Sequence, residues 1–212
     1  MATYRLLNAL ICMVLGSAGA WSQTLQLFES DTGATEVEAQ IGDVIEIEVM
    51  ANLGRFAASG LALYVSVPHA FQIVDTHPDD ADDMRPFHQG ALFAGATEAG
   101  NILLSAEEMQ GMKRDKYMLS YAVVLGPGEN RARTGQGVVA CFKVLCVEAA
   151  EQSPIGITSN PILETRLVLA DGWTEQRFTV VKGLAITVQD QDTTVEPDQS
   201  WGQIKADFTR AD

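Results

Sequence analysis

The chain of 212 residues has few cysteines, few aromatic side chains and no long apolar run. Of its three cysteines, Cys12 lies in the N-terminal apolar segment, which leaves Cys141 and Cys146. On one extended strand these two would lie about 17 Å apart and point to opposite faces. A disulfide needs Cα atoms within about 7 Å. The sequence therefore predicts no disulfide between them, and two buried thiols that pack as small apolar groups.

Positive charge is also scarce. There are 14 Lys and Arg residues against 28 Asp and Glu residues, which gives a formal net charge of -14. Such a surface repels both nucleic-acid phosphates and anionic membranes. No segment reaches the roughly 20 apolar residues of a membrane-spanning helix. We therefore expect no nucleic-acid partner and no membrane span.

Motifs for catalysis are missing as well. The sequence has no Gly-x-Ser-x-Gly elbow, no His-Glu-x-x-His pair, and no glycine-rich phosphate loop after a predicted strand. An acidic stretch containing Asp75, His77, Asp79 and Asp82 offers oxygen and imidazole ligands, but it lacks the glycine and glutamate spacing of an EF-hand. We interpret it as a solvated acidic loop, and predict a non-enzyme without metal or cofactor.

The N-terminus has the pattern of a secretory signal. Arg5 precedes an apolar run over residues 6–15, and small residues follow at 16–20. The protein is therefore expected to be secreted, into the periplasm or outside the cell, where attachment to a cell surface is a further option. The predicted organisation has a signal peptide at residues 1–22 and a β-sandwich at residues 23–188. An acidic linker at 189–199 and a short helical segment at 200–212 follow.

Apolar residues recur with a period of two along most of the remaining chain, which is typical of half-buried β-strands. In the clearest segment, residues 135–147, one side of the strand carries Val138, Ala140, Phe142 and Val144. Glycine-rich turns separate these segments, and about nine short strands with such turns indicate an all-β sandwich. The predicted strands lie at residues 25–28, 44–49, 61–67, 71–74, 102–105, 117–125, 137–147, 155–158, 165–170, 178–181 and 184–188.

The order and spacing of four motifs resemble those of a cohesin domain. They are Ile41-Gly42-Asp43 with its following strand, Gly90-Ala91-Leu92-Phe93, the strand from Gly135, and the closing strand from Gly183 to Val188. The resemblance covers about residues 24–188. It implies a nine-stranded jelly roll related to carbohydrate-binding modules, which binds a dockerin-like protein through an exposed sheet face. The calcium of that pair belongs to the dockerin, and the family's usual setting is polysaccharide breakdown.

Four residues are candidates for the partner-binding face: Tyr64, Ser66, Tyr117 and Tyr121. Tyr117 and Tyr121 share one side of their predicted strand, with Leu119 between them. A second class of function stays open, because sugar-binding sandwiches present rows of aromatic rings, and Trp173 occupies a predicted turn. A third is a structural subunit for the cell surface or adhesion, which would associate with copies of itself.

The C-terminal segment combines a capping serine with a one-sided apolar pattern. Trp201, Ile204 and Phe208 fall on one face of a helix that begins after Ser200. A helix of about ten residues is marginal in water unless that face is covered. We expect it to dock on the sandwich or on a second protein, and disorder is the remaining alternative.

Overall fold

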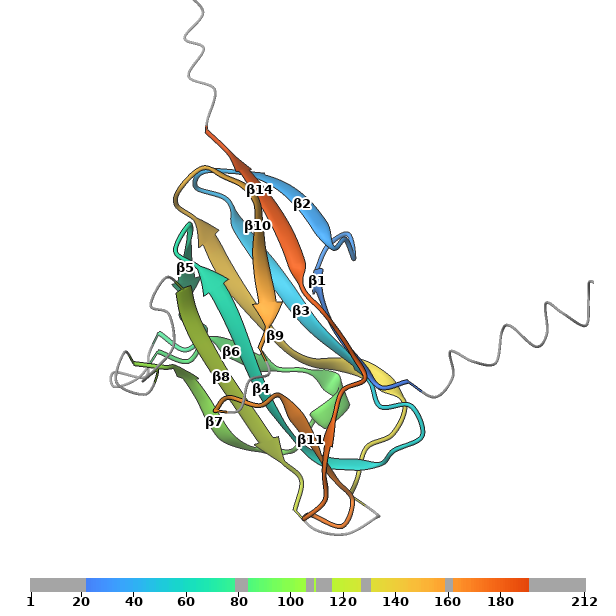
Figure 1. The fold of residues 1–212 in the computed structure, drawn as a ribbon. Coiled ribbons are helices and arrows are strands. Elements are labelled where there is room, and N and C mark those ends of the chain that lie inside the picture. Colours follow the sequence, from blue (N-terminus) through green and yellow to red (C-terminus); the bar gives the residue numbers. More distant parts are fainter. Residues whose placement is uncertain are drawn as a thin grey trace, which may run out of the picture.

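A computed structural model describes residues 22–78, 84–105, 109, 116–126, 131–158 and 162–190. The chain forms two β-sheets that pack face to face (Figure 1). The one helix in this part of the chain is the short 3₁₀ turn η1, Ala91–Phe93. The strands are β1 Thr24–Glu29, β2 Glu36–Gln40, β3 Val44–Asn52, β4 Ala58–Pro68, β5 Phe71–Val74, β6 Phe87–Gln89, β7 Thr97–Leu103, β8 Lys116–Val124, β9 Gln136–Cys146, β10 Ala150–Ile157, β11 Arg166–Leu169, β12 Glu175–Arg177, β13 Val180–Lys182 and β14 Leu184–Gln189.

The two sheets differ in size. The six-stranded sheet has the order β13-β1-β3-β9-β5, and β6 pairs with β9 as well. The eight-stranded sheet has the order β12-β11-β4-β10-β14-β2, and β8 and β7 extend it from the other edge of β4. Strand β4 is therefore the hub of the larger sheet, because β8 covers one of its edges while β11 and β10 share the other.

The inward-facing residues are those that the period of two predicts. Along β4, Leu61, Leu63, Val65 and Val67 are all buried in the main core. Ile47 and Val49 of β3 are buried too. Both sheets contribute apolar side chains to one continuous core, so burial of these faces supplies the main driving force for packing. The expected all-β sandwich is confirmed.

Strand β9 departs from the expected alternation at one point. Val49 pairs with Ala140 and Met50 pairs with Val138, so Val139 is an extra residue in a β-bulge. Val139 is fully buried while Val138 is only partly buried, which reverses the predicted sides of these two residues. The bulge also brings Gly90 close, because its N–H donates to the Val139 carbonyl at 3.0 Å. A Cβ atom at Gly90 would lie 2.3 Å from the Val138 oxygen, so this contact requires glycine.

The strand number is higher than predicted. The described residues form fourteen strands rather than about nine, because the short strands β2, β6 and β12 lack a strong apolar pattern and were not predicted. The expected C-terminal helix with Trp201, Ile204 and Phe208 lies outside the described residues, as do most of the acidic linker and nearly all of the signal peptide. Within the described residues, no helix is long and apolar enough to cross a membrane.

Candidate partner-binding face

The outer face of the eight-stranded sheet is formed around β4 and β8, and cross-strand pairing places its residues in rows. One row runs Gly100, Ala122, Ala62, Arg166 and Arg177 across β7, β8, β4, β11 and β12. The next row contains Ile102, Ser120 and Tyr64, and a third contains Met118, Ser66 and Gly156. We call this surface the β4–β8 face. Two of the predicted partner-binding residues, Tyr64 and Ser66, lie on it.

Tyr117 and Tyr121 lie on the opposite side of the sheet. Tyr121 pairs with Leu63 and is fully buried, so its assignment to an exposed binding face was wrong. Tyr117 pairs with Val67, packs against the main core and contacts His69, with tilted rings whose centroids lie 4.6 Å apart. The physical reason is the period of two: Leu119 belongs to the core, and the residues two positions away must face the same way.

The centre of the β4–β8 face is apolar. A second hydrophobic cluster, separate from the main core, consists of buried Leu104, Met109, Met118 and Leu163. Tyr64 and Ile102 are partly buried against it. Leu104 follows β7 and Leu163 precedes β11, so the described residues of these connections lie against the outside of the sheet. Such satellite clusters form under long connections, and this one fixes the ring of Tyr64 on the face.

The backbone of Tyr64 is held by a threonine side chain. Strands β10 and β11 pair with the same edge of β4, β10 up to residue 157 and β11 from residue 166. Between them, this edge of β4 has a gap at Tyr64, where no described strand is paired with it. The hydroxyl of buried Thr165 fills this gap, because it accepts the Tyr64 N–H at 3.0 Å and donates to the Thr158 carbonyl at 2.6 Å. The Thr158 N–H donates to the Tyr64 carbonyl at 2.8 Å. Thr165 could not be predicted from the sequence, since the gap arises only where two strands, β10 and β11, pair with the same edge of β4.

Charged residues border the apolar centre on the β11–β12 side. Arg166 contacts Glu175 at 2.6 Å and Glu164 at 3.7 Å, and Arg177 forms a further ion pair with Glu164. Exposed ion pairs of this kind contribute little to stability, about 0–1 kcal/mol each. An apolar centre with a polar rim is the usual anatomy of a protein–protein interface. Ser66 lies inside the rim and its hydroxyl is already used, because it donates to the Gly156 carbonyl at 3.2 Å.

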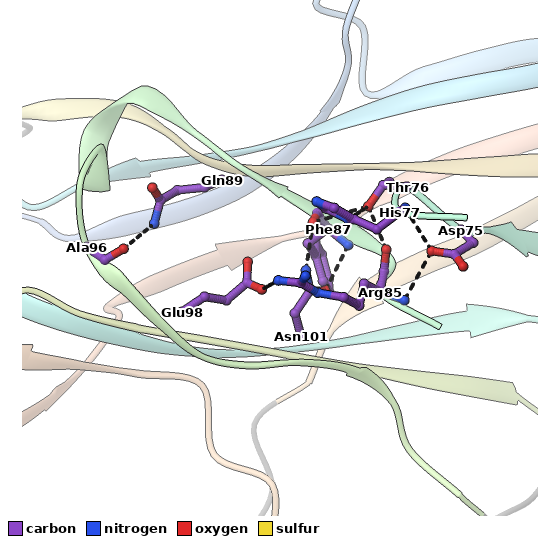
Figure 2. A network of polar contacts seen from close by, with 9 residues as sticks. All are labelled: Asp75, Thr76, His77, Arg85, Phe87, Gln89, Ala96, Glu98 and Asn101. Atoms are coloured by element: carbon purple, nitrogen blue, oxygen red, sulfur yellow. Dashed lines mark hydrogen bonds and ion pairs between the residues drawn. The ribbon is translucent and has the colours of Figure 1, made fainter. Parts of the chain in front are cut away.

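The acidic stretch considered for metal binding has a structural role where it is described (Figure 2). The Asp75 carboxylate accepts the backbone N–H groups of His77 at 2.9 Å and Arg85 at 3.2 Å. The Thr76 hydroxyl donates to the Arg85 carbonyl at 2.6 Å. These bonds join the two ends of the segment between β5 and β6. Asp79 and Asp82 lie outside the described residues.

Two imidazole rings meet beside this segment. His77 and His88 have ring centroids 5.2 Å apart, and His77 Nδ1 lies 2.8 Å from the Thr76 hydroxyl. Across the residues that the structure describes, no three His, Cys, Asp or Glu side chains are placed to hold one metal ion. In its described part, the stretch is a connection between β5 and β6 whose two ends are joined by hydrogen bonds of Asp75 and Thr76 with Arg85.

Among the comparisons with known proteins, only the one with solved structures found matches. No protein-family model matches the sequence, and no curated protein matches it either. Solved structures do match. A type II cohesin domain from the cellulosome of Acetivibrio cellulolyticus has a TM-score of 0.57 at 14% identity, over 78% of this chain and 95% of that one. Type II cohesin A11 from Bacteroides cellulosolvens has a TM-score of 0.54 at 13% identity, over 79% and 99%.

The chain has the fold of a cohesin domain. A third similar structure is a type I cohesin–dockerin complex from Clostridium thermocellum, with a TM-score of 0.51 at 10% identity, over 81% of this chain and 96% of that one. These matches confirm the resemblance that the spacing of the turns and strands indicated. At identities this low the likeness is one of fold, and the residues of the face are this chain's own.

The two thiols of this cohesin-like chain lie on opposite sides of β9, as expected. Both are free, so the prediction that they form no disulfide with each other is confirmed. Cys146 is buried, whereas Cys141 is half-buried on the outer side opposite Glu48, which corrects the expectation of two buried thiols. Burial raises the pKa of each thiol, and nearby carboxylates, Glu46 and Glu48 for Cys141 and Asp43 for Cys146, raise it further. Both are therefore protonated and unreactive near neutral pH.

Proposed function

We propose that the protein is a secreted, non-catalytic binding module that docks a dockerin-like protein on its β4–β8 face. The observation that carries the proposal is the cohesin fold combined with a face on which the partly exposed Tyr64 and Ile102, packed against the buried Met118, are bordered by a charged rim. Two further structures with this fold are cohesins in complex with dockerins, the third cohesin of ScaC and the sixth of scaffoldin B from Acetivibrio cellulolyticus. Their TM-scores are both 0.50.

Several features support docking on this face rather than elsewhere. Ala62, Ser120 and Ala122 are small, so a partner can approach the sheet closely between Tyr64 and the rim. Ile162, beside the buried Leu163, is 63% exposed and extends the apolar area toward solvent. The proposed setting is extracellular, with polysaccharide breakdown as the process that the docked partner would serve.

The test uses paired variants on the two outer faces of the sandwich. Ser120→Arg places a bulky charge in the middle row of the β4–β8 face, and Gln72→Arg places the same group on exposed β5 of the other sheet. The immobilised full-length protein is incubated with the secretome of its own organism. Any captured protein is then identified, purified and titrated against each variant by calorimetry.

The proposal expects one partner with a dockerin domain, bound at least tenfold more weakly by Ser120→Arg and unchanged by Gln72→Arg, since a central interface position costs more than about 1.4 kcal/mol when blocked. Equal binding by both variants would place the site elsewhere. Capture of no protein, together with a clear signal on a glycan array, would replace the proposal by the sugar-binding alternative.

One observation favours that alternative enough to keep it. Trp173 is 87% exposed at the turn between β11 and β12. The Asp171 carboxylate accepts the N–H groups of Trp173 at 3.0 Å and Thr174 at 2.9 Å, so the turn that presents the ring is held in place. An exposed indole presented by such a turn can stack on a sugar ring. A glycan-array signal that disappears in Trp173→Ala would support this function.

A further inference from the structure

Strand β2 forms one end of the eight-stranded sheet. Of the described strands it pairs with β14 alone, in parallel, from Glu36 opposite Ala185 to Gln40 opposite Gln189. In Figure 1 it lies beyond β14 at the margin of the sandwich. Its other edge has no strand beside it among the described residues. An edge strand of this kind offers a row of backbone groups to a further strand.

The hydrogen bonds between β2 and β14 show which backbone N–H and C=O groups of β2 point away from β14. The Ala185 N–H donates to the Thr35 carbonyl at 3.0 Å, and the Ile41 N–H donates to the Gln189 carbonyl at 3.1 Å. In a parallel pair, every second residue of a strand points its backbone N–H and C=O groups to the partner. The backbone groups of Val37 and Ala39 therefore also face β14. Those of Glu36 and Glu38 face the free edge, where no bond to them is found within the described part of the chain.

The free edge ends at a turn in which Gln40 and Asp43 are hydrogen-bonded to each other. The Gln40 N–H donates to an Asp43 carboxylate oxygen at 2.8 Å, and the Asp43 N–H donates to the Gln40 carbonyl at 3.1 Å. The accessible part of the edge therefore consists of Glu36 and Glu38 and extends over about two pairs of backbone hydrogen bonds.

A groove runs along this edge, which we call the β2 groove. It has a volume of about 480 Å³. Val37 and Ile45, which also pack against the main core, give it an apolar floor. Four carboxylates line it and no lysine or arginine does; they belong to Glu29, Asp31, Glu36 and Glu38.

One of these charges is held fixed. Glu29 accepts the Thr32 hydroxyl at 2.6 Å and the Thr32 and Asp31 N–H groups at 2.7 and 3.1 Å. The bond from the Thr32 hydroxyl, with help from the two N–H groups, lowers the pKa of the Glu29 carboxyl, so it stays ionised in moderately acidic surroundings.

We propose that the β2 groove binds an extended, positively charged segment of a partner protein, which adds to β2 as a new edge strand. The segment would bond to the Glu36 and Glu38 backbone, place alternate apolar side chains on Val37 and Ile45, and direct lysine or arginine side chains to the four carboxylates. Strand addition of this type takes affinity from the backbone bonds and specificity from the alternating side chains.

Charge decides between the possible occupants. A second copy paired edge to edge would bring Glu36 and Glu38 against the same residues, and like charges opposite one another destabilise a strand pair. The chain's own residues 190–212 contain more acidic than basic side chains, so they do not complement the groove. A cationic partner segment is the one occupant that the four carboxylates favour. This site is separate from the β4–β8 face, so the inference stands or falls independently of the proposed function.

The probe is a fluorescein-labelled peptide of sequence Lys-Val-Lys-Val-Lys-Val, titrated against the full-length protein by fluorescence anisotropy. Two control peptides separate the contributions: the acidic counterpart Glu-Val-Glu-Val-Glu-Val, and the basic peptide with alternate backbone nitrogens methylated to remove its N–H donors. Amide hydrogen exchange at Glu36 and Glu38 is followed by NMR with and without the basic peptide.

Three protein variants accompany these peptides. Glu38→Pro removes an N–H that the fold does not use, which edge strands tolerate. Glu38→Gln removes only the charge. Glu148→Gln removes an exposed charge outside the groove. Melting temperatures of all three check that the fold is retained.

The proposal expects the basic peptide to bind, to slow amide exchange at Glu36 and Glu38, and to bind about 2- to 10-fold more weakly to Glu38→Pro than to Glu38→Gln, as the loss of one hydrogen bond predicts. Glu148→Gln should bind as the unaltered protein does. Absence of binding, or equal binding of the methylated peptide, overturns the proposal. The edge glutamates would then serve only to prevent strand pairing.

Discussion

The side-chain amide of Asn101 forms two hydrogen bonds with the backbone of Phe87, at 2.9 Å from the Phe87 N–H and at 2.7 Å to the Phe87 carbonyl. Phe87 belongs to β6 of the six-stranded sheet and Asn101 to β7 of the eight-stranded sheet (Figure 2). The amide thus bonds to the N–H and C=O groups of Phe87 as the backbone of a neighbouring strand would, and it joins the two sheets where β6 and β7 approach each other. Both residues are buried, so water cannot replace either bond.

Replacing Asn101 by leucine should destabilise the protein strongly. The change leaves the buried Phe87 N–H without a partner, at a cost of about 1–3 kcal/mol, and leaves the Phe87 carbonyl with only the long 3.3 Å bond from the Thr76 hydroxyl. Urea denaturation should therefore show a loss of about 1–4 kcal/mol. Gln72→Leu, at an exposed position of β5, is the matched control and should change stability by less than about 0.5 kcal/mol. A small effect of Asn101→Leu would mean that the sheets are joined mainly by apolar packing.

Removing the hydroxyl of Tyr121 should be neutral or stabilising. The ring lies 5.1 Å from that of Phe87 in the core, while its hydroxyl is buried and has no hydrogen-bond partner among the described residues. Tyr121→Phe keeps the ring and removes the unpaired group. Thermal unfolding should show an equal or higher Tm for Tyr121→Phe, whereas Tyr121→Ala should lose about 3–5 kcal/mol because of the cavity. A clear loss in Tyr121→Phe would reveal a hydrogen bond to the hydroxyl, from the nearby Gln89 side chain or from a bound water.

Thr165→Val should loosen the β4–β8 face. The substitution keeps the shape of the side chain but leaves the Tyr64 N–H and the Thr158 carbonyl unpaired where β10 and β11 separate. We expect a loss of about 1–3 kcal/mol in urea denaturation, and faster amide exchange at Tyr64 than in the unaltered protein. Thr165→Ser, which keeps the hydroxyl, should restore slow exchange. If the serine variant exchanges as fast as the valine variant, the methyl group and not the hydroxyl holds the gap closed.

Acid should remove a contribution of Glu29. Its folded pKa is below the ordinary value of 4.5 because the Thr32 hydroxyl and two backbone N–H groups bond to the ionised form. Bonding to the ionised form stabilises the fold above the unfolded pKa, and that stabilisation is lost as the pH falls through the folded pKa. The Tm difference between the unaltered protein and Glu29→Gln should therefore be present at pH 6 and shrink below about pH 4.5. A Tm difference that stays constant with pH would mean that the charge of Glu29 does not stabilise the loop.

The sequence predicted the layers of this fold better than its surfaces. Strands β4 and β9 were found because each carries a long apolar set at a period of two, which burial between two sheets enforces. Strand β2, with the sequence Glu-Val-Glu-Ala-Gln, was not found, since it has little apolar surface and is specified by pairing with β14 at the far end of the chain.

The candidate site was only half predicted, for a related reason. Alternation places Tyr117 and Tyr121 on one side of β8, but it does not state which side meets the other sheet. The neighbouring set of Met118, Ser120 and Ala122 is smaller and more polar, and that contrast was the available signal for the outer face. Thr165 and Asn101 had no signal, because their partners are 101 and 14 residues away and belong to other strands.

The pairing of the first strands with the last has a consequence for how the chain folds. Strands β1 and β2 have β13 and β14 beside them, in parallel and about 150 residues later. Closing so long a loop is entropically costly, and folds dominated by distant contacts form slowly. A nascent chain that has reached only residue 170 would have both sheets incomplete at these strands. Slow, late closure of this kind leaves β1 and β2 without their parallel neighbours until β13 and β14, near the end of the sandwich, have been synthesised.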